Sequence, residues 1–162
     1  MSGERQPTPS QTVGPFFGFA LPFEHDYDAG EGEQALRIEG RLTDGQGQSV
    51  PDGLIEVWSG DQFARCRTDE EGAFRFVISR PQRRPGDGDA PHLDVAVFAR
   101  GLLRHLVTRM YLPDESASNA QDRVLRSVDE NRRSSLIAER DGQILRFDIR
   151  LQGEKETVFF AI

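Results

Sequence analysis

The sequence predicts an all-β fold, a two-sheet β-sandwich with a short helix and an extended N-terminal arm. Three observations predict it: from residue 36 onward, short runs alternate apolar and polar residues, Gly, Asp and Pro clusters separate them, and the runs recur at short intervals. A chain of 162 residues is long enough for one domain with one real core. We expect residues 1–35 to form the arm and residues 36–162 the sandwich, as parts of the same domain.

The expected strands follow one another along the chain. They are 36–43, 53–59, 64–68, 73–79, 92–100 and 105–112, then a hairpin of SLIAER and QILRFDIRL, and a last strand at 156–160. Asp141 and Gly142 suit the tight type I′ turn of that hairpin. Residues 116–133 break the strand pattern, because Ala120, Val124 and Val128 recur every four residues, which is typical of a helix.

Composition excludes several classes of protein. A net charge of −7 argues against the basic surface that nucleic-acid binding needs. The single Cys66 excludes an internal disulfide, and we expect it to be a small buried hydrophobe, as we expect Trp58 to be a core residue. The N-terminus lacks the pattern of a secretory signal, and FFGFALPF is too short to cross a membrane, so a cytoplasmic protein is expected.

The arm carries four phenylalanines in a segment broken by Gly and Pro, without strand or helix period: Phe16, Phe17, Phe19 and Phe23. Ordering such a segment costs on the order of 1 to 2 kcal/mol per residue, while burying a Phe returns about 1.5 to 3 kcal/mol. We therefore expect the arm to be ordered only where it docks, on its own sandwich or on a partner chain.

Several segments, in their order and spacing, resemble the intradiol ring-cleavage dioxygenases. They are TVGPFF at 12–17, RIEGRLTDGQGQSVPDGLIEVW at 37–58, T-D-x-x-G-x-F-x-F at 68–76, PHLDVAVF at 91–98, TRMYLPDE at 108–115 and LRFDIRLQG at 145–153. The likeness runs from about residue 10 to the C-terminus and is greatest to the alpha subunits of hetero-oligomeric members. It implies a higher oligomer of alpha–beta pairs that uses a ferric non-haem ion and O2 to open protocatechuate to 3-carboxy-cis,cis-muconate.

The resemblance also implies an iron site of two tyrosines and two histidines, with the histidines arriving as H-x-H on the strand at 92–100. Here His92 matches the first histidine, but Asp94 stands at the second. The loops that would carry the tyrosines, at 60–66 and 80–90, contain none, because no tyrosine lies between Tyr27 and Tyr111. We therefore expect no metal ligand and no catalytic residue in this chain, and Fe3+ held by the beta subunit instead.

A rival interpretation keeps a metal here. His92, Asp94 and His105 can be written as the 2-His-1-carboxylate pattern of a stand-alone ferrous oxygenase. Strand parity places His92 and Asp94 on one face, but His105 belongs to the next strand. Otherwise Asp94 should pair with an arginine, because an unpaired buried carboxylate costs several kcal/mol.

What the resemblance implies for this chain is a contribution to the beta subunit's substrate pocket. The matching residues are Thr12, Gly14 and Pro15 of T-V-G-P, and Arg133. Glycine lets a backbone approach a ligand closely, and an arginine can meet a carboxylate with two parallel hydrogen bonds. Arg132 is adjacent to Arg133, so which of the two faces substrate stays open. A third possibility is an assembly module that touches no substrate.

Overall fold

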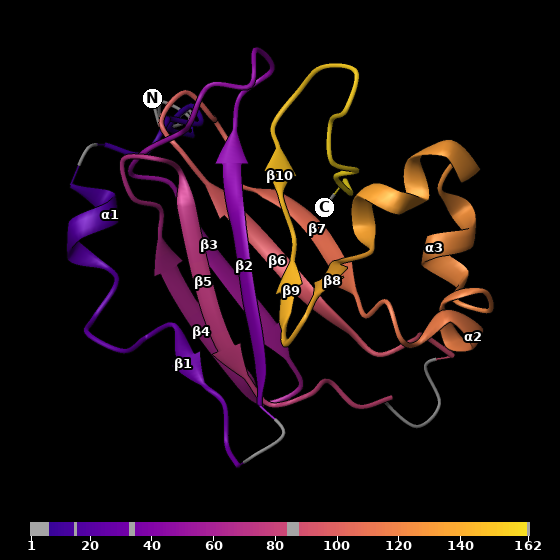
Figure 1. Cartoon of the computed structure of the whole chain (residues 1–162). Helices are drawn as coiled ribbons and strands as arrows, with labels where there is room; N and C mark the ends of the chain where they lie inside the picture. The colour runs from indigo at the N-terminus through magenta and orange to yellow at the C-terminus, as the bar shows by residue number, and fades with distance from the viewer. Residues whose placement is uncertain (1–6, 15, 33–34, 84–87, 162) are drawn as a thin grey trace, which may run out of the picture.

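The computed structural model describes residues 7–14, 16–32, 35–83 and 88–161. Among these residues the strands form two packed sheets, so the predicted β-sandwich is confirmed (Figure 1). The first sheet has the order β1 (Asp28–Ala29), β5 (Ala73–Ile78), β2 (Leu36–Thr43), β9 (Ile144–Arg146) and β8 (Glu139–Asp141), with β10 (Ile149–Arg150) also paired to β2. The second has the order β4 (Gln62–Arg67), β3 (Leu54–Ser59), β6 (His92–Phe98) and β7 (Leu106–Tyr111).

The core lies between the two sheets and follows from the alternation of the strands. In β6 the residues Leu93, Val95 and Val97 are buried while their neighbours in the strand are only half-buried. Ile38 and Leu42 of β2 meet them from the first sheet in one apolar cluster. Each such side chain contributes about 1.5 to 3 kcal/mol when it is buried.

The hairpin near the C-terminus turns one residue later than predicted. Asp141 is still in β8, paired with Ile144, so Gly142 and Gln143 form the turn. Only Gly142 has a positive φ, 59°, which fits a type II′ turn rather than type I′. The strand expected at 156–160 is reduced to a single bridge between Phe160 and Val107.

The prediction of a single helix over 116–133 is wrong. The segment forms α2 (Ser116–Asn119), α3 (Arg123–Ser127) and a 3-10 helix, η1 (Glu130–Leu136), which gather at one end of the sandwich (Figure 1). The break has a local cause, because the Asp122 carboxylate accepts a hydrogen bond from the N–H of Leu125 at 2.7 Å and so starts a new helix.

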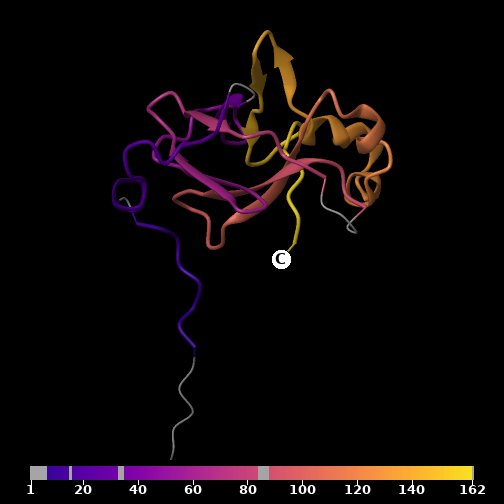
Figure 2. The ribbon, with the colours of Figure 1, turned by 90° about the horizontal axis from the view of Figure 1, so that it is seen from below.

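The arm docks in part on its own sandwich. It contains α1 (Phe17–Ala20), and the ring of Phe17 lies 5.4 Å from that of Phe98. Phe16 and Phe23, however, stay 77% and 75% exposed. The first described residues run away from the body (Figure 2). The arm therefore keeps apolar surface that its own chain does not cover.

Trp58 is not a core residue, which corrects the prediction. It is 46% exposed, on the outer face of the second sheet, where its ring packs on Phe63 at 4.3 Å. Among the described residues, no helix is long and apolar enough to cross a membrane.

Candidate functional site

His92 and Asp94 lie side by side at the start of β6, as the alternation predicts. The Nε2 atom of His92 is 3.4 Å from Oδ1 of Asp94. Its Nδ1 atom is 2.7 Å from the carbonyl oxygen of Ala90, which is a hydrogen-bond distance. The imidazole thus has a polar neighbour at each ring nitrogen.

Arg109 of β7 faces this pair. Its Nε atom lies 3.3 Å from Oδ1 of Asp94, and its Nη1 atom lies 2.9 Å from Oδ2 of Asp89. The predicted pairing of Asp94 with an arginine is confirmed. One guanidinium therefore bridges two carboxylates at the end of the strand pair.

The ferrous site built on His92, Asp94 and His105 is wrong. In the register of β6 and β7, His92 pairs with Tyr111 and Val97 with Leu106, so His105 belongs at the far end of β7. Six residues along a strand span roughly 20 Å, too far to share one ion. The ring of His105 instead stacks on Phe98 at 5.1 Å.

The residues at the family's iron position do not fit a ferric site. They line a cleft of about 120 Å³: Ser59, Gln82, Asp89, Ala90, His92, Asp94 and Arg109. No tyrosine is among them, and the cation of Arg109 already sits between the carboxylates. Within the described part of the chain, no three His, Cys, Asp or Glu side chains are arranged to hold a metal ion.

Neither tyrosine can supply a phenolate to this cleft. Tyr111 is fully buried, and its hydroxyl donates to Oδ1 of Asp122 at 3.0 Å. Burial, together with the nearby Asp122 carboxylate, raises the pKa of Tyr111 well above its ordinary value, so the hydroxyl stays protonated. Tyr27 packs against the first sheet, where the guanidinium carbon of Arg75 lies 4.6 Å from the centre of its ring.

Asp122 is a buried polar centre that the sequence interpretation missed. Its carboxylate accepts hydrogen bonds from the N–H of Ala90 at 2.8 Å, the N–H of Leu125 and the hydroxyl of Tyr111. Burial alone would raise its pKa, but these donors and the charge of Arg109 outweigh it and hold the pKa below its ordinary value. An aspartate directly before R-V-L-R is an N-cap signal that could have revealed it.

Cys66 on β4 packs against the core as predicted, but it is half-buried and not buried. Burial raises the pKa of its thiol, so the thiolate is disfavoured. The cysteine is therefore a packing residue.

The arm residues are fastened near the connection between β6 and β7. The Thr12 hydroxyl accepts a hydrogen bond from the N–H of Gly101 at 2.7 Å. A Cβ added to Gly14 would meet nothing within 4 Å, so the space beside its Cα is open, while its carbonyl oxygen accepts a hydrogen bond from the N–H of Phe17. Pro15 lies outside the described residues.

Arg133 and Arg132 of η1 line different clefts. Arg133 is half-buried, and its Nε and Nη2 atoms donate to the carbonyl oxygens of Val128 at 2.9 Å and Arg126 at 3.2 Å. It lines a mostly apolar cleft of about 260 Å³. Its other N–H groups have no partner among the described residues.

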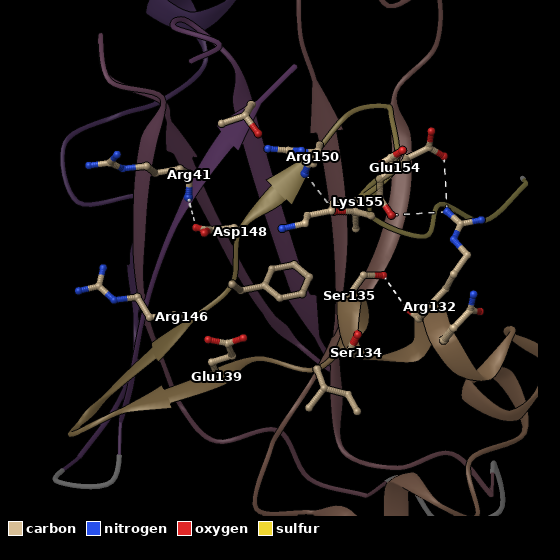
Figure 3. A pocket seen from close by; sticks show the side chains of 16 residues that line it. Arg41, Arg132, Ser134, Ser135, Glu139, Arg146, Asp148, Arg150, Glu154 and Lys155 are labelled. Atoms are coloured by element: carbon tan, nitrogen blue, oxygen red, sulfur yellow. Dashed lines mark hydrogen bonds and ion pairs between the residues drawn. The ribbon is translucent and has the colours of Figure 1, made fainter. Parts of the chain in front are cut away.

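Arg132 lines a larger cleft of about 570 Å³, drawn in Figure 3. Its Nη2 atom is 3.6 Å from a carboxylate oxygen of Glu156, and both side chains are substantially exposed. Lys155 and Arg150 reach into the same cleft, where Asp148 accepts a hydrogen bond from the N–H of Arg41 (Figure 3). The wall thus mixes charges of both signs.

The structure does not bring the predicted arm residues and Arg133 into one cavity. Thr12 is tied to the loop that enters β7, whereas η1 joins the other end of β7 through the bridge of Tyr111 with Ile137. The two places lie at opposite ends of the strand. A single small pocket can therefore use both only if they come from two copies of this chain.

Comparison with known proteins identifies close relatives. The chain is 38% identical to the protocatechuate 3,4-dioxygenase alpha chain of Burkholderia cepacia, covering 96% of this chain and 97% of the relative. It is 35% identical to the alpha chain of Pseudomonas putida, covering 94% and 95%. The chain is also 28% identical to the protocatechuate 3,4-dioxygenase beta chain of Burkholderia cepacia, over 84% of this chain and 74% of that relative.

The fold has known counterparts as well. An intradiol ring-cleavage dioxygenase from Tetranychus urticae superposes with a TM-score of 0.63, covering 88% of this chain and 94% of that one, at 14% identity. This likeness shows the shared sandwich. No family model matches the chain.

Proposed function

The chain belongs to the family of protocatechuate 3,4-dioxygenase alpha chains, which are intradiol ring-cleavage dioxygenases, and on this basis we propose that it completes the active-site pocket of a beta chain. The reaction of that pocket is the O2-dependent opening of protocatechuate to 3-carboxy-cis,cis-muconate. The observation that carries the proposal is the 38% and 35% identity to the two alpha-chain relatives over nearly the whole length of each chain. The existence of a homologous beta chain supports the partnership.

The family uses non-haem iron, and the ferric ion is held by the beta chain in this proposal. Two features of the present chain support that assignment: Asp94 replaces the second histidine, and no tyrosine lines the cleft above it. No step of the reaction is therefore assigned to a metal in this chain.

Arg133 meets the carboxylate of protocatechuate. Two of its N–H groups donate hydrogen bonds to backbone carbonyl oxygens, which fixes the side chain before substrate binds. An arginine carries five N–H donors, so enough remain for a carboxylate. A charged group held in advance loses less conformational entropy on binding than a free one.

The arm, within residues 1–35, docks on the beta chain and places Thr12, Gly14 and Pro15 beside the pocket. The exposure of Phe16 and Phe23 supports this, because large apolar side chains left in water often mark contact sites. Thr12 uses an oxygen lone pair on Gly101 but can still donate its hydroxyl hydrogen.

The pure assembly module remains the rival, favoured by the fact that Thr12 and Arg133 both bond to their own chain. Co-expression with a beta chain separates the two. Arg133→Ala should raise the KM for protocatechuate by about tenfold or more, since a hydrogen bond to a charged group contributes about 1.5 to 3 kcal/mol. Arg132→Ala is the matched control and should change KM little.

Catechol sharpens the test because it lacks the carboxylate. Its affinity for the complex should be nearly the same with Arg133→Ala as with the wild-type chain. Wild-type kinetics for Arg133→Ala with protocatechuate would support the assembly module instead.

A further inference from the structure

We propose that the Arg109 guanidinium takes the place of a metal ion at the start of β6 and β7, and that this side chain keeps metal out of this chain. The cluster consists of Asp89, His92, Asp94 and Arg109, and we call it the Arg109 cluster. The inference concerns this chain alone and does not rest on the proposed function.

Strand register places Arg109 directly beside the His92 and Asp94 pair. Asp94 of β6 pairs directly with Arg109 of β7. His92 lies on the same face two residues before Asp94, and its Nε2 atom reaches Oδ1 of Asp94 at 3.4 Å. An imidazole and a carboxylate are both metal-ligand types, but with Arg109 in place no three His, Cys, Asp or Glu side chains of the described residues are arranged to hold an ion. The facing residue is a cation instead.

The charges around Arg109 are those that a divalent cation prefers. Two carboxylates point at the guanidinium, at 3.3 Å from Asp94 to Nε and 2.9 Å from Asp89 to Nη1. The side chains of Arg109 and Asp89 are only 20% and 17% exposed, so solvent screens this attraction incompletely. Oδ1 of Asp89 is buried and has no hydrogen-bond partner in the described part of the chain.

Removing the guanidinium would leave those acceptors uncompensated. A carboxylate that loses its partner while still partly buried is strongly destabilised, and a cation from solvent can restore the balance. The cleft of about 120 Å³ beside the cluster offers room for an ion and bound water. Removing the Arg109 guanidinium should therefore raise the affinity of this position for a metal ion.

Metal binding to the isolated full-length chain tests this with Co2+, which gives a visible spectrum when it is coordinated. The wild-type chain should bind no Co2+ in equilibrium dialysis. Arg109→Ala should bind close to one equivalent, with imidazole coordination visible in the spectrum. Arg109→Lys keeps a cation and should stay empty.

Arg80→Ala is a matched control, because Arg80 also bridges two carboxylates, Asp114 and Glu115, but without a histidine. It should bind no Co2+. Adding His92→Gln to Arg109→Ala should lower Co2+ affinity at least tenfold. If Arg109→Ala does not fold, Arg109→Gln keeps part of the stem without the charge and serves in its place.

Two results would overturn the inference. One is a folded, uncharged variant at position 109 that binds no Co2+, since donor geometry and not the guanidinium would then exclude metal. The other is stoichiometric Co2+ on the wild-type chain.

Discussion

Asp94 on β6 and Arg109 on β7 are paired across the strands, with Nε of Arg109 3.3 Å from Oδ1 of Asp94. The H-x-D pair, which has the spacing of metal ligands, therefore faces a cation. The second sheet keeps the strand arrangement of the shared fold, and an ion pair occupies the start of β6, where the resemblance would put the two histidines. The residues proposed to act on substrate, in the arm and at Arg133, lie outside this ion pair.

Replacing Asp122 should destabilise the fold. Asp122→Ala removes the cap of α3 and leaves the N–H of Ala90 and the hydroxyl of Tyr111 without their acceptor. We expect a loss of about 2 to 3 kcal/mol in the free energy of unfolding, measured by urea denaturation. Asp141→Ala is the control: its side chain is 69% exposed, and the change should stay within about 0.5 kcal/mol. Equal effects of the two changes would contradict the role given to Asp122.

Asp122 should also contribute to acid unfolding. Its pKa is lower in the folded chain than the value of about 3.9 typical of an unfolded one, so the ionised carboxylate stabilises the fold above that value. The contribution is lost as pH falls below about 4 through the folded-state pKa. Urea midpoints measured across this range should fall less steeply for Asp122→Asn than for the wild-type chain. Parallel curves would show that other carboxylates carry the acid sensitivity.

Gly14→Ala should affect the complex but not the isolated chain. The added Cβ meets nothing within 4 Å in this chain, so the thermal midpoint should be unchanged. In the complex with a beta chain, the KM for protocatechuate should rise, because a backbone that lies against a ligand has no room for a methyl group. An unchanged KM would remove Gly14 from the proposed pocket.

Gly40→Ala provides the opposite case. A Cβ at this position in β2 would collide with the carbonyl oxygen of Phe147, which belongs to the backbone and cannot move aside. We expect a loss of about 3 kcal/mol or more in the free energy of unfolding. A wild-type urea midpoint would be inconsistent with the close approach of these two segments.

Thr12→Val should loosen the arm. It removes the acceptor for the N–H of Gly101 and should cost about 1 kcal/mol or less, because both groups can turn to water. Limited proteolysis should cut the arm faster in this variant, whereas Thr12→Ser keeps the hydroxyl and should behave as the wild-type chain does. Cleavage of all three chains at one rate would mean that this bond does not hold the arm.

Much of the fold could be predicted from local patterns. The alternation along 36–43 and 92–98 sets which residues are buried, and the observed β2 and β6 follow it closely. The helical segment could not be predicted as one element, because the Asp122 cap outweighs the four-residue period of apolar residues. Trp58 was misplaced because a large aromatic at a strand end can lie on either face.

The site was less predictable, since it depends on register between strands. Sequence spacing alone suggests His105 as the third ligand, but only the pairing of β6 with β7 shows that Arg109 stands opposite Asp94. The adjacent Arg132 and Arg133 look equivalent in sequence, yet the turn of η1 directs them into different clefts. Both outcomes depend on contacts between residues far apart along the chain.

The most direct measurement is O2 consumption with protocatechuate by this chain alone, by a beta chain alone, and by the two together, with iron measured in each sample. The chain alone should be inactive and free of iron. Adding it to the beta chain should raise turnover until the two are equimolar, without raising the iron content per beta chain. Turnover by this chain alone, or a beta chain whose kinetics do not change when it is added, would contradict a pocket shared between the two.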